Sequence, residues 1–383
     1  MNLEELGRLA GVSRSTVSRV VNGDARVSQD ARVRVQTAIR ASGYVPHAAA
    51  RSLASNRTRI LGLLIPGAVG FIFSDPYFPK LVQGVVDACN AADYGMMLMM
   101  EPADDPVVAE RIYQRVIRGH HLDGVIVTTS LIGDPLLERL AADELPAVLI
   151  GRHPSLPSLT TVDVDNRGAA CRAVQHLLGH GYRRVAHLAG PTDIMASIDR
   201  ADGYRDALFA AGIPIDDSLV IACDFTEANG RDAMRRLLAH PDGRPDAVFC
   251  GSDTMAAGAF RALAEFGLSA PRDIALMGFD GLEQHAVSFP HLSTVVQPIP
   301  ELGRSAVGAF LARIACPDEP PAQLILPTRL ALRGSCGCLN DDDLDVAPWM
   351  VQVGRGGPRR AASEPAVADP TVAEHALAET SAG

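Results

Sequence analysis

The sequence lacks any segment suited to carry the chain into or across a membrane. No run approaches the ~20 apolar residues that a bilayer span requires. The N-terminus also lacks a basic start followed by an apolar core of roughly 7 to 15 residues, the pattern of a secretory leader. We therefore expect a cytoplasmic protein without a membrane partner.

Familiar catalytic motifs are missing as well. The chain has no Gly-x-Ser-x-Gly elbow, no phosphate-cradling Gly-x-x-x-x-Gly-Lys loop and no His-Glu-x-x-His helix. We expect no enzymatic activity, assign no catalytic residue and foresee no cofactor.

Cysteine is scarce, odd in number and scattered, which indicates buried, reduced thiols in a reducing compartment. Only Cys336-Gly337-Cys338 forms a close pair. No second Cys or His pair at zinc spacing is evident beside it, so we interpret it as an incidental pair at the end of a strand and expect no metal site. The seven cysteines are Cys89, Cys171, Cys223, Cys250, Cys316, Cys336 and Cys338.

Charge is distributed unevenly over the 383 residues. The formal net charge is -10, yet residues 1–60 hold ten Arg against four acidic residues, about +6, which leaves about -16 for the remainder. Phosphate neutralisation depends on local cations, so only this basic head is expected to meet a polyanion.

The first residues predict three short helices that share one small core. Asn2 and Ser13 are good N-caps for the first two helices, and Val27-Ser28 precedes the third. Gly11 and Gly43 are placed to end the first and third helices.

Residues 11–22 join a turn to a helix, which is the arrangement of a helix-turn-helix that lodges its second helix in the major groove. Arg14 and Arg19 can each donate two hydrogen bonds to a guanine edge, while Ser13, Ser18 and Asn22 suit phosphate contacts or capping. The predicted DNA contacts here are Ser13, Arg14, Ser15, Thr16, Ser18, Arg19 and Asn22.

After Arg59, apolar strand-like runs alternate with amphipathic helices. Strands buried on both faces with intervening helices predict parallel α/β sheets, and the strands are too many for one sheet. Two lobes are expected, with the chain passing between them near 157–165, 291–296 and 320–326. Residues 339–383, rich in Asp, Pro, Ala and Gly, are expected to form a disordered tail without the leucine heptads of a tetramerising bundle.

The run from Leu6 to Pro46 resembles the DNA-binding head of the LacI family of bacterial repressors, apart from Gly7, where the family has better helix formers. Residues 46–54 resemble that family's hinge helix, whose leucine wedges into the central minor-groove step of the operator. The resemblance adds Arg51 and Leu53 as DNA contacts. It also implies a homodimer on a pseudo-palindromic operator, controlled by a small-molecule effector.

The body resembles the family's periplasmic-binding-protein-like core over about residues 58–338, through motifs such as Asp75-Pro76-Tyr77-Phe78, Gly251-Ser252-Asp253 and Gly278-Phe279-Asp280. An effector in such a fold binds between the lobes, where a carboxylate and a guanidinium can hold sugar hydroxyls and aromatic faces can cover the apolar side of the ring. Ser252 stands where relatives often have Asn. The resemblance implies effector contacts from Asp75, Phe78, Thr128, Arg200, Phe225, Ser252, Asp253, Asp280 and Gln297.

The expected organisation is therefore an all-α head and hinge helix followed by a two-lobed α/β core. The boundaries are 1–45 for the head, 46–58 for the hinge, 59–162 with 294–320 for the first lobe, and 163–293 with 321–338 for the second. A sugar is the favoured effector, with a nucleobase or a protein as alternatives, and the sequence leaves open whether the effector induces or corepresses. A stand-alone solute receptor would have no use for the Arg-rich head.

Overall fold

The computed structural model describes residues 1–21, 24, 26–44, 57–66, 75–101, 110–111, 113–114, 118–119, 121–128, 131–143, 145–282 and 290–338. The predicted contacts Asn22, Arg51 and Leu53, and the tail at 339–383, lie outside these residues. Among the described helices, none has both the length and the apolar composition needed to cross a membrane.

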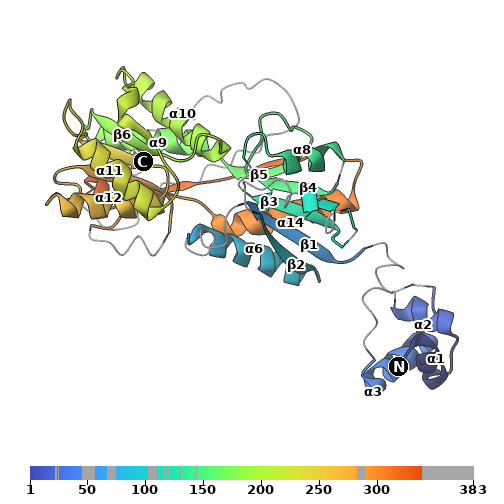
Figure 1. The fold of residues 1–383 in the computed structure, drawn as a ribbon. Coiled ribbons are helices and arrows are strands. Elements are labelled where there is room, and N and C mark those ends of the chain that lie inside the picture. Colours follow the sequence, from blue (N-terminus) through green and yellow to red (C-terminus); the bar gives the residue numbers. More distant parts are fainter. Residues whose placement is uncertain are drawn as a thin grey trace, which may run out of the picture. The chain divides into compact units, whose positions relative to one another are not determined.

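The head consists of three helices, α1 (Leu3–Ala10), α2 (Arg14–Val21) and α3 (Gln29–Ser42) (Figure 1). Asn2 caps α1 in a reciprocal capping box with Glu5, and Gly11 ends it in the left-handed conformation. The expected small core is confirmed, and it comprises Leu6, Ala10, Val17, Val20, Val35 and Ala38.

Gly7, the departure from the family pattern, lies where α1 approaches the turn into α2. A Cβ at this position would stand 2.8 Å from the carbonyl oxygen of Val12, closer than real Cβ atoms come. Glycine is therefore favoured here by the close approach of two backbone segments, at a cost of about 1 kcal/mol in helix propensity.

The body contains two six-stranded sheets, as the alternation of strands and helices predicts. In the first, all neighbouring strands are parallel. In the second, only β12 runs antiparallel, against β10. The first sheet has the order β11 (Gln323–Leu326), β5 (Thr160–Val164), β4 (Ala147–Ile150), β3 (Gly124–Thr128), β1 (Ile60–Pro66), β2 (Gly95–Glu101), and the second the order β12 (Arg329–Ala331), β10 (Ser293–Val296), β9 (Ala275–Asp280), β8 (Ala247–Cys250), β6 (Val185–Ala189), β7 (Val220–Ala222).

Helices cover both sheets and define the first lobe and the second lobe (Figure 1). Each lobe has two buried apolar clusters, one on each face of its sheet, where helices pack against the strands. The first lobe holds α6 (Tyr77–Ala91), α8 (Pro135–Ala142) and α14 (Ile299–Ala315), and the second holds α9 (Asn166–Gly179), α10 (Met195–Ala210), α11 (Glu227–Leu238) and α12 (Asp253–Glu265), with the short 3-10 helices η2 (Asp217–Leu219) and η3 (Gly334–Cys336).

The chain passes between the lobes three times, directly after β5, β10 and β11. The stretches that we expected to be connections are in large part these strands themselves. Residues 160–164 are buried along their whole length, because the β-branched Thr and Val side chains pack on both faces of the sheet. Residues 294–296 belong to the second sheet, although we predicted them in the first lobe. Residues 323–326 belong to the first sheet, although we predicted them in the second lobe. The sequence predicts helices near 77–92, 106–118, 167–179, 198–211, 228–239 and 253–266, so α8 and α14 were missed.

Candidate functional site

Helix α2 divides its side chains between the core and the surface at helical spacing. Val17 and Val20 are buried, whereas Arg14, Ser15 and Arg19 are exposed. Thr16 and Ser18 are half-buried between these two faces. One face of α2 therefore packs on the core of the head. The other face exposes the two guanidinium groups and the Ser15 hydroxyl to solvent, as a helix that enters a DNA groove requires.

The first turn of α2 is fixed by Ser13. Its Oγ accepts a hydrogen bond from the backbone N–H of Thr16 at 3.2 Å and lies 2.8 Å from Ser15 Oγ. Arg14 lies 3.8 Å from Glu4 in an exposed pair, worth at most about 1 kcal/mol in such a setting. A phosphate or base could replace Glu4 at little cost.

A cavity of about 60 Å³ lies where the two lobes meet, next to the connections that follow β5 and β10. Both lobes contribute to its wall, which combines charged, amide and apolar side chains. The lining residues are Tyr77, Ile150, Gly151, Arg152, Asp163, Asn166, Ile194, Met195, Ala196, Arg200, Gln297 and Leu302.

Arg200 of α10 is the buried cation of this cavity, with 6 % of its surface exposed. Its Nε donates to Asn166 Oδ1 at 2.9 Å and one Nη donates to the carbonyl of Gly251 at 2.6 Å. The guanidinium carbon stands 3.7 Å from the centre of the Phe279 ring. Burial lowers the pKa of Arg200, and Asp280 opposes that shift.

Asp280, the last residue of β9, places a carboxyl group 3.7 Å from Arg200 Nη1. Gln297 Nε2 donates to the same oxygen at 2.6 Å. Burial raises the pKa of Asp280 well above its usual value, although Arg200 pulls it down. Asp280 has a φ of 116°, which is rare for a residue other than glycine and marks strain at candidate sites.

Asp163 near the end of β5 and Asn166 at the start of α9 complete the polar wall. Asn166 Nδ2 donates to Asp163 Oδ1 at 3.0 Å, and the Val164 N–H donates to the same oxygen at 2.8 Å. Burial raises the pKa of Asp163 to about 7. Asn166 therefore links Asp163 of the first lobe to Arg200 of the second.

An ion pair joins the lobes beside the cavity. Arg152, which follows β4 of the first lobe, donates from Nε to Asp199 Oδ2 of α10 at 2.7 Å and makes a second bond to the other carboxylate oxygen. The side chain of Arg152 is 44 % exposed, whereas that of Asp199 is only 8 % exposed. The pair therefore bridges the two lobes beside the cavity.

The cavity wall suits a neutral, hydroxyl-rich ligand. Buried carboxyl and amide groups can accept and donate hydrogen bonds, and Tyr77, Met195 and Leu302 offer apolar surface beside them.

Three of the nine predicted effector residues come together here. Arg200 and Gln297 line the cavity, and Asp280 contacts both. Phe225 is half-buried 6.0 Å from the Arg200 guanidinium, outside the lining. Asp75 accepts the N–H of Tyr77 at 3.0 Å at the start of α6.

The other four predicted residues are buried away from the lining. Phe78 packs in the core of the first lobe, and Thr128 is fully buried at the end of β3. Ser252 caps α12 by accepting from the Met255 N–H. The carboxylate of Asp253 accepts from Leu282 N–H at 2.7 Å and from Thr294 Oγ1 at 2.6 Å, so it ties α12 to its own lobe.

Four of the lining residues with polar side chains were not among the predicted effector contacts, namely Tyr77, Arg152, Asp163 and Asn166. Three of them lie at or just beyond the carboxyl ends of β4 and β5, where ligands bind in open α/β sheets. Identification of β5 as a strand would have found Asp163 and Asn166.

The Cys336 and Cys338 pair lies outside this cavity, beside His176 and His180. We expected no second pair of ligands near it. That expectation was wrong, because the histidines are some 160 residues away in sequence and only folding brings them close.

Comparison with known proteins places both parts of the chain. Residues 2–47 match the description "Bacterial regulatory proteins, lacI family", and residues 174–336 match "Periplasmic binding protein-like domain". The HTH-type transcriptional regulator CelR of Thermobifida fusca is 37 % identical over 336 residues, 87 % of this chain and 97 % of the relative. The ribose operon repressor of Escherichia coli K12 is 34 % identical, over 87 % of this chain and 99 % of the relative.

A solved structure described as a transcriptional regulator CelR-cellobiose complex shares 36 % identity and superposes with a TM-score of 0.69, over 88 % of this chain and 99 % of that one. These relatives are regulators, and the similarity spans head and body together. The chain belongs to the lacI family of bacterial regulatory proteins and is a DNA-binding transcription regulator of that type.

Proposed function

We propose that the chain is a homodimeric operator-binding repressor controlled by a carbohydrate held between its lobes. The observation that carries the proposal is the buried set of Arg200, Asp280 and Gln297 at the cavity where both lobes meet. The similarity to a regulator solved with cellobiose and to a ribose operon repressor supports a sugar over a nucleobase.

Sugar recognition follows from the donors and acceptors of this wall. A carboxylate can accept from two neighbouring hydroxyls, and a guanidinium and an amide can donate to others. The cavity of about 60 Å³ is smaller than the roughly 300–1,000 Å³ of typical ligand sites. We infer that binding widens this cavity by movement of the lobes, and a ligand that binds one arrangement better shifts the population toward it.

The exposed face of α2 supplies the sequence reading. Arg14 and Arg19 would hydrogen-bond guanine edges from the major groove, with Ser15 and Thr16 beside them and Ser13 and Ser18 near phosphates. The further contacts predicted from sequence are Asn22, Arg51 and Leu53. Two heads in a dimer would read the two halves of an inverted repeat.

Binding of the full chain to duplexes from the DNA flanking its gene tests the proposal. Fluorescence anisotropy should show tight, salt-sensitive binding to an inverted repeat and a change in affinity with cellobiose, ribose or another sugar. Arg19→Ala should weaken operator binding by about 1–3 kcal/mol, whereas Arg244→Ala, which removes an exposed charge from the body, should not.

Two results would contradict this function. Absence of salt-sensitive attachment to any inverted repeat would remove the DNA-binding role. Calorimetric heat with nucleobases and none with a panel of sugars would replace the carbohydrate effector with another class.

A further inference from the structure

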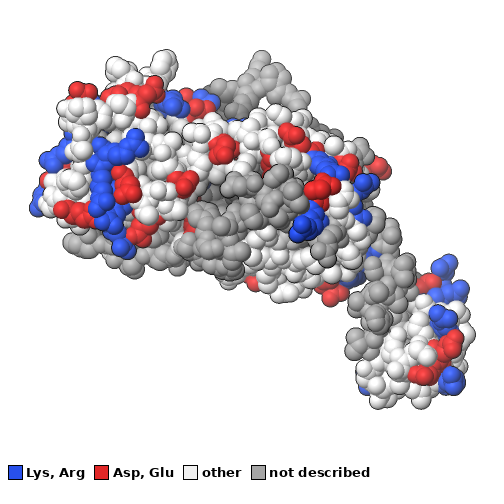
Figure 2. Space-filling model, viewed as in Figure 1, with Lys and Arg blue, Asp and Glu red and all other residues white. Residues whose placement is uncertain are grey.

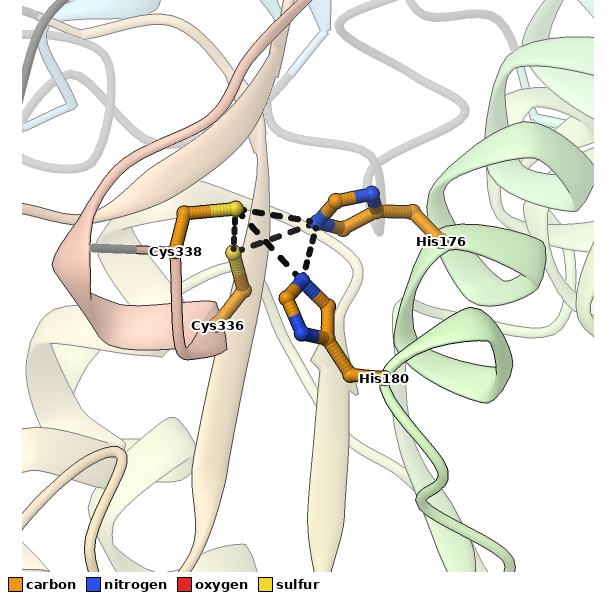
Figure 3. A group of neighbouring side chains, drawn as sticks. All are labelled: His176, His180, Cys336 and Cys338. Atoms are coloured by element: carbon orange, nitrogen blue, oxygen red, sulfur yellow. Dashed lines mark hydrogen bonds between the residues drawn. The ribbon is translucent and has the colours of Figure 1, made fainter. Parts of the chain in front are cut away.

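His176, His180, Cys336 and Cys338 form a compact group of side chains on the second lobe (Figure 3). Their four potential ligand atoms all lie within 4.8 Å of one another. Cys336 is buried, His176 and Cys338 are half-buried, and His180 is exposed. An ion from solvent could therefore reach the group without rearrangement of the core.

Five of the six separations are close to those around a single tetrahedral ion, and all six are below 4.8 Å. Zinc binds thiolate at about 2.3 Å and imidazole at about 2.0–2.1 Å, so the edges of its coordination tetrahedron measure roughly 3.3–3.8 Å. Here the two sulfurs are 3.4 Å apart, the two Nε2 atoms are 3.1 Å apart, and Cys338 Sγ is 3.5 Å and 3.4 Å from His176 and His180. Cys336 Sγ lies 3.3 Å from His176 Nε2.

Local structure on both sides presents the ligands. His176 and His180 are four residues apart at the end of α9, so both rings project from one face. On the other side, Gly337 adopts a φ of 99° between the two cysteines. That left-handed conformation favours glycine, and it turns both sulfurs toward the histidines (Figure 3).

The ligand set identifies the ion and its role. Two thiolates and two imidazoles in a tetrahedral arrangement suit Zn²⁺, and four protein ligands leave no open position, as in structural sites. A two-iron cluster with this ligand set would place its cysteines and histidines on different irons, which the mixed short separations here do not fit.

We propose that these four side chains bind one zinc ion that fastens the C-terminal segment to the second lobe. The segment comprises β12 and η3. Elsewhere it is held by the pairing of β12 with β10 and by the buried Ser335, whose Oγ donates to the Leu276 carbonyl at 2.8 Å. Asn166, which lines the cavity, begins α9, and the histidines lie at its other end, about 20 Å away at 1.5 Å per residue. The ion is thus structural and separate from the effector cavity.

Metal analysis of the full chain, purified under reducing conditions without chelator, tests the site. We expect about one zinc per chain by mass spectrometry. Replacement by Co²⁺ should give the visible absorption of tetrahedral cobalt with thiolate ligands. Cys338→Ser and His180→Ala should each lower the bound metal at least ~5-fold, whereas the matched variants Cys316→Ser and His121→Ala, at exposed positions elsewhere, should keep it.

A measurement on the unaltered chain covers the case in which the variants misfold. Cys338 should resist alkylation in the metal-loaded protein and react after treatment with EDTA, while exposed Cys316 reacts equally in both. Metal removal should also lower Tm by on the order of 5 °C.

Three outcomes would overturn the proposal. The first is a chain that contains no zinc and shows no spectral change with Co²⁺. The second is alkylation of Cys338 at the same rate with and without EDTA. The third is a disulfide between Cys336 and Cys338 that persists in the chain purified under reducing conditions, because oxidised sulfurs cannot bind the ion.

Discussion

The two lobes share one strand order but differ in what they place at the cleft. From one edge to the other, the first sheet has the order β2-β1-β3-β4-β5-β11 and the second the order β7-β6-β8-β9-β10-β12, so β4 corresponds to β9. In the second lobe, β9 ends in the buried Asp280, which faces the buried Arg200. In the first lobe, the corresponding β4 is followed by Gly151 and the half-exposed Arg152. The same strand order thus places the ends of β4 and β9 at the cleft, while the residues at those ends determine which charged groups line it.

The ion pairs on the surface differ from the buried pair of Arg200 and Asp280. On the face of the body shown in Figure 2, positive and negative side chains lie next to one another. Ion pairs with partly exposed side chains on the body include those of Arg231 and Arg235 with Glu265. Exposed pairs of this kind contribute little to stability, so the buried pair in the cleft is where a charge change should matter most.

The largest effect is expected from Arg200→Ala. Removal of this guanidinium leaves Asp280 buried without its cation, which should lower the free energy of unfolding by about 3–5 kcal/mol. Urea unfolding measures the loss, and calorimetry should show no effector heat at a temperature where the variant is folded. Arg205→Ala on the same helix, whose pair with Asp202 is exposed, should change stability by less than about 1 kcal/mol. Equal losses for both variants would remove the distinction between buried and exposed pairs.

The second test concerns pH and Asp163, which lies near the carboxyl end of β5. Because burial raises the pKa of Asp163 to about 7, the folded chain keeps this proton above pH 4 while the unfolded chain releases it. The contribution of Asp163 to stability is therefore complete below about pH 4 and is lost as pH rises to about 7, by roughly 1 kcal/mol per pH unit.

Asp163→Asn should remove this slope, as chemical denaturation of both proteins between pH 4 and 7.5 would show. Asp206→Asn serves as the control, since its hydrogen bond to Arg167 lowers the pKa of Asp206 and its own contribution changes only below about pH 4. If the free energies of unfolding of Asp163→Asn and the unaltered chain differ by the same amount at every pH, the raised pKa of Asp163 would be contradicted.

The strand ends themselves give a third test. Gly151 has a φ of 110° and an added Cβ would meet nothing within 4 Å, so Gly151→Ala probes backbone strain alone. We expect a loss of about 1–3 kcal/mol in thermal unfolding. Gly308→Ala, at an open position within α14, should instead stabilise the chain by up to about 1 kcal/mol. Should Gly151→Ala be neutral, the strain attributed to Asp280 at a similar φ would also be in doubt.

The smallest effect on stability is expected from Arg152→Ala. The pair with Asp199 is partly exposed on the Arg152 side, which screens the charge, but the variant leaves the buried Asp199 without its cation, so the loss should be about 1–2 kcal/mol. Because the pair bridges the lobes, effector affinity should still shift several-fold, measured by calorimetry. Arg167→Ala, which breaks a pair within the second lobe, should leave affinity unchanged.

Much of the architecture could be predicted from local patterns. Capping residues such as Asn2 and Ser28 locate the starts of α1 and α3, and continuous apolar runs locate β1, β3 and β4. Residues 160–164 and 293–296 escaped prediction because Thr, Ser and Asp interrupt the apolar pattern there. Those polar side chains are tolerated in buried strands since partners elsewhere satisfy them, as Asn166 does for Asp163.

The sequence by itself determined the basic head and the alternation of strands and helices, and its resemblance to a known family predicted effector contacts at Arg200 and Asp280. Only the tertiary structure decided which side chains distant in sequence contact one another. Arg152 meets Asp199 across two lobes, and His176 meets Cys336 across 160 positions. Periodicity and caps act over a few residues, whereas such meetings depend on the pairing of strands and the packing of helices, which fix side-chain directions in three dimensions.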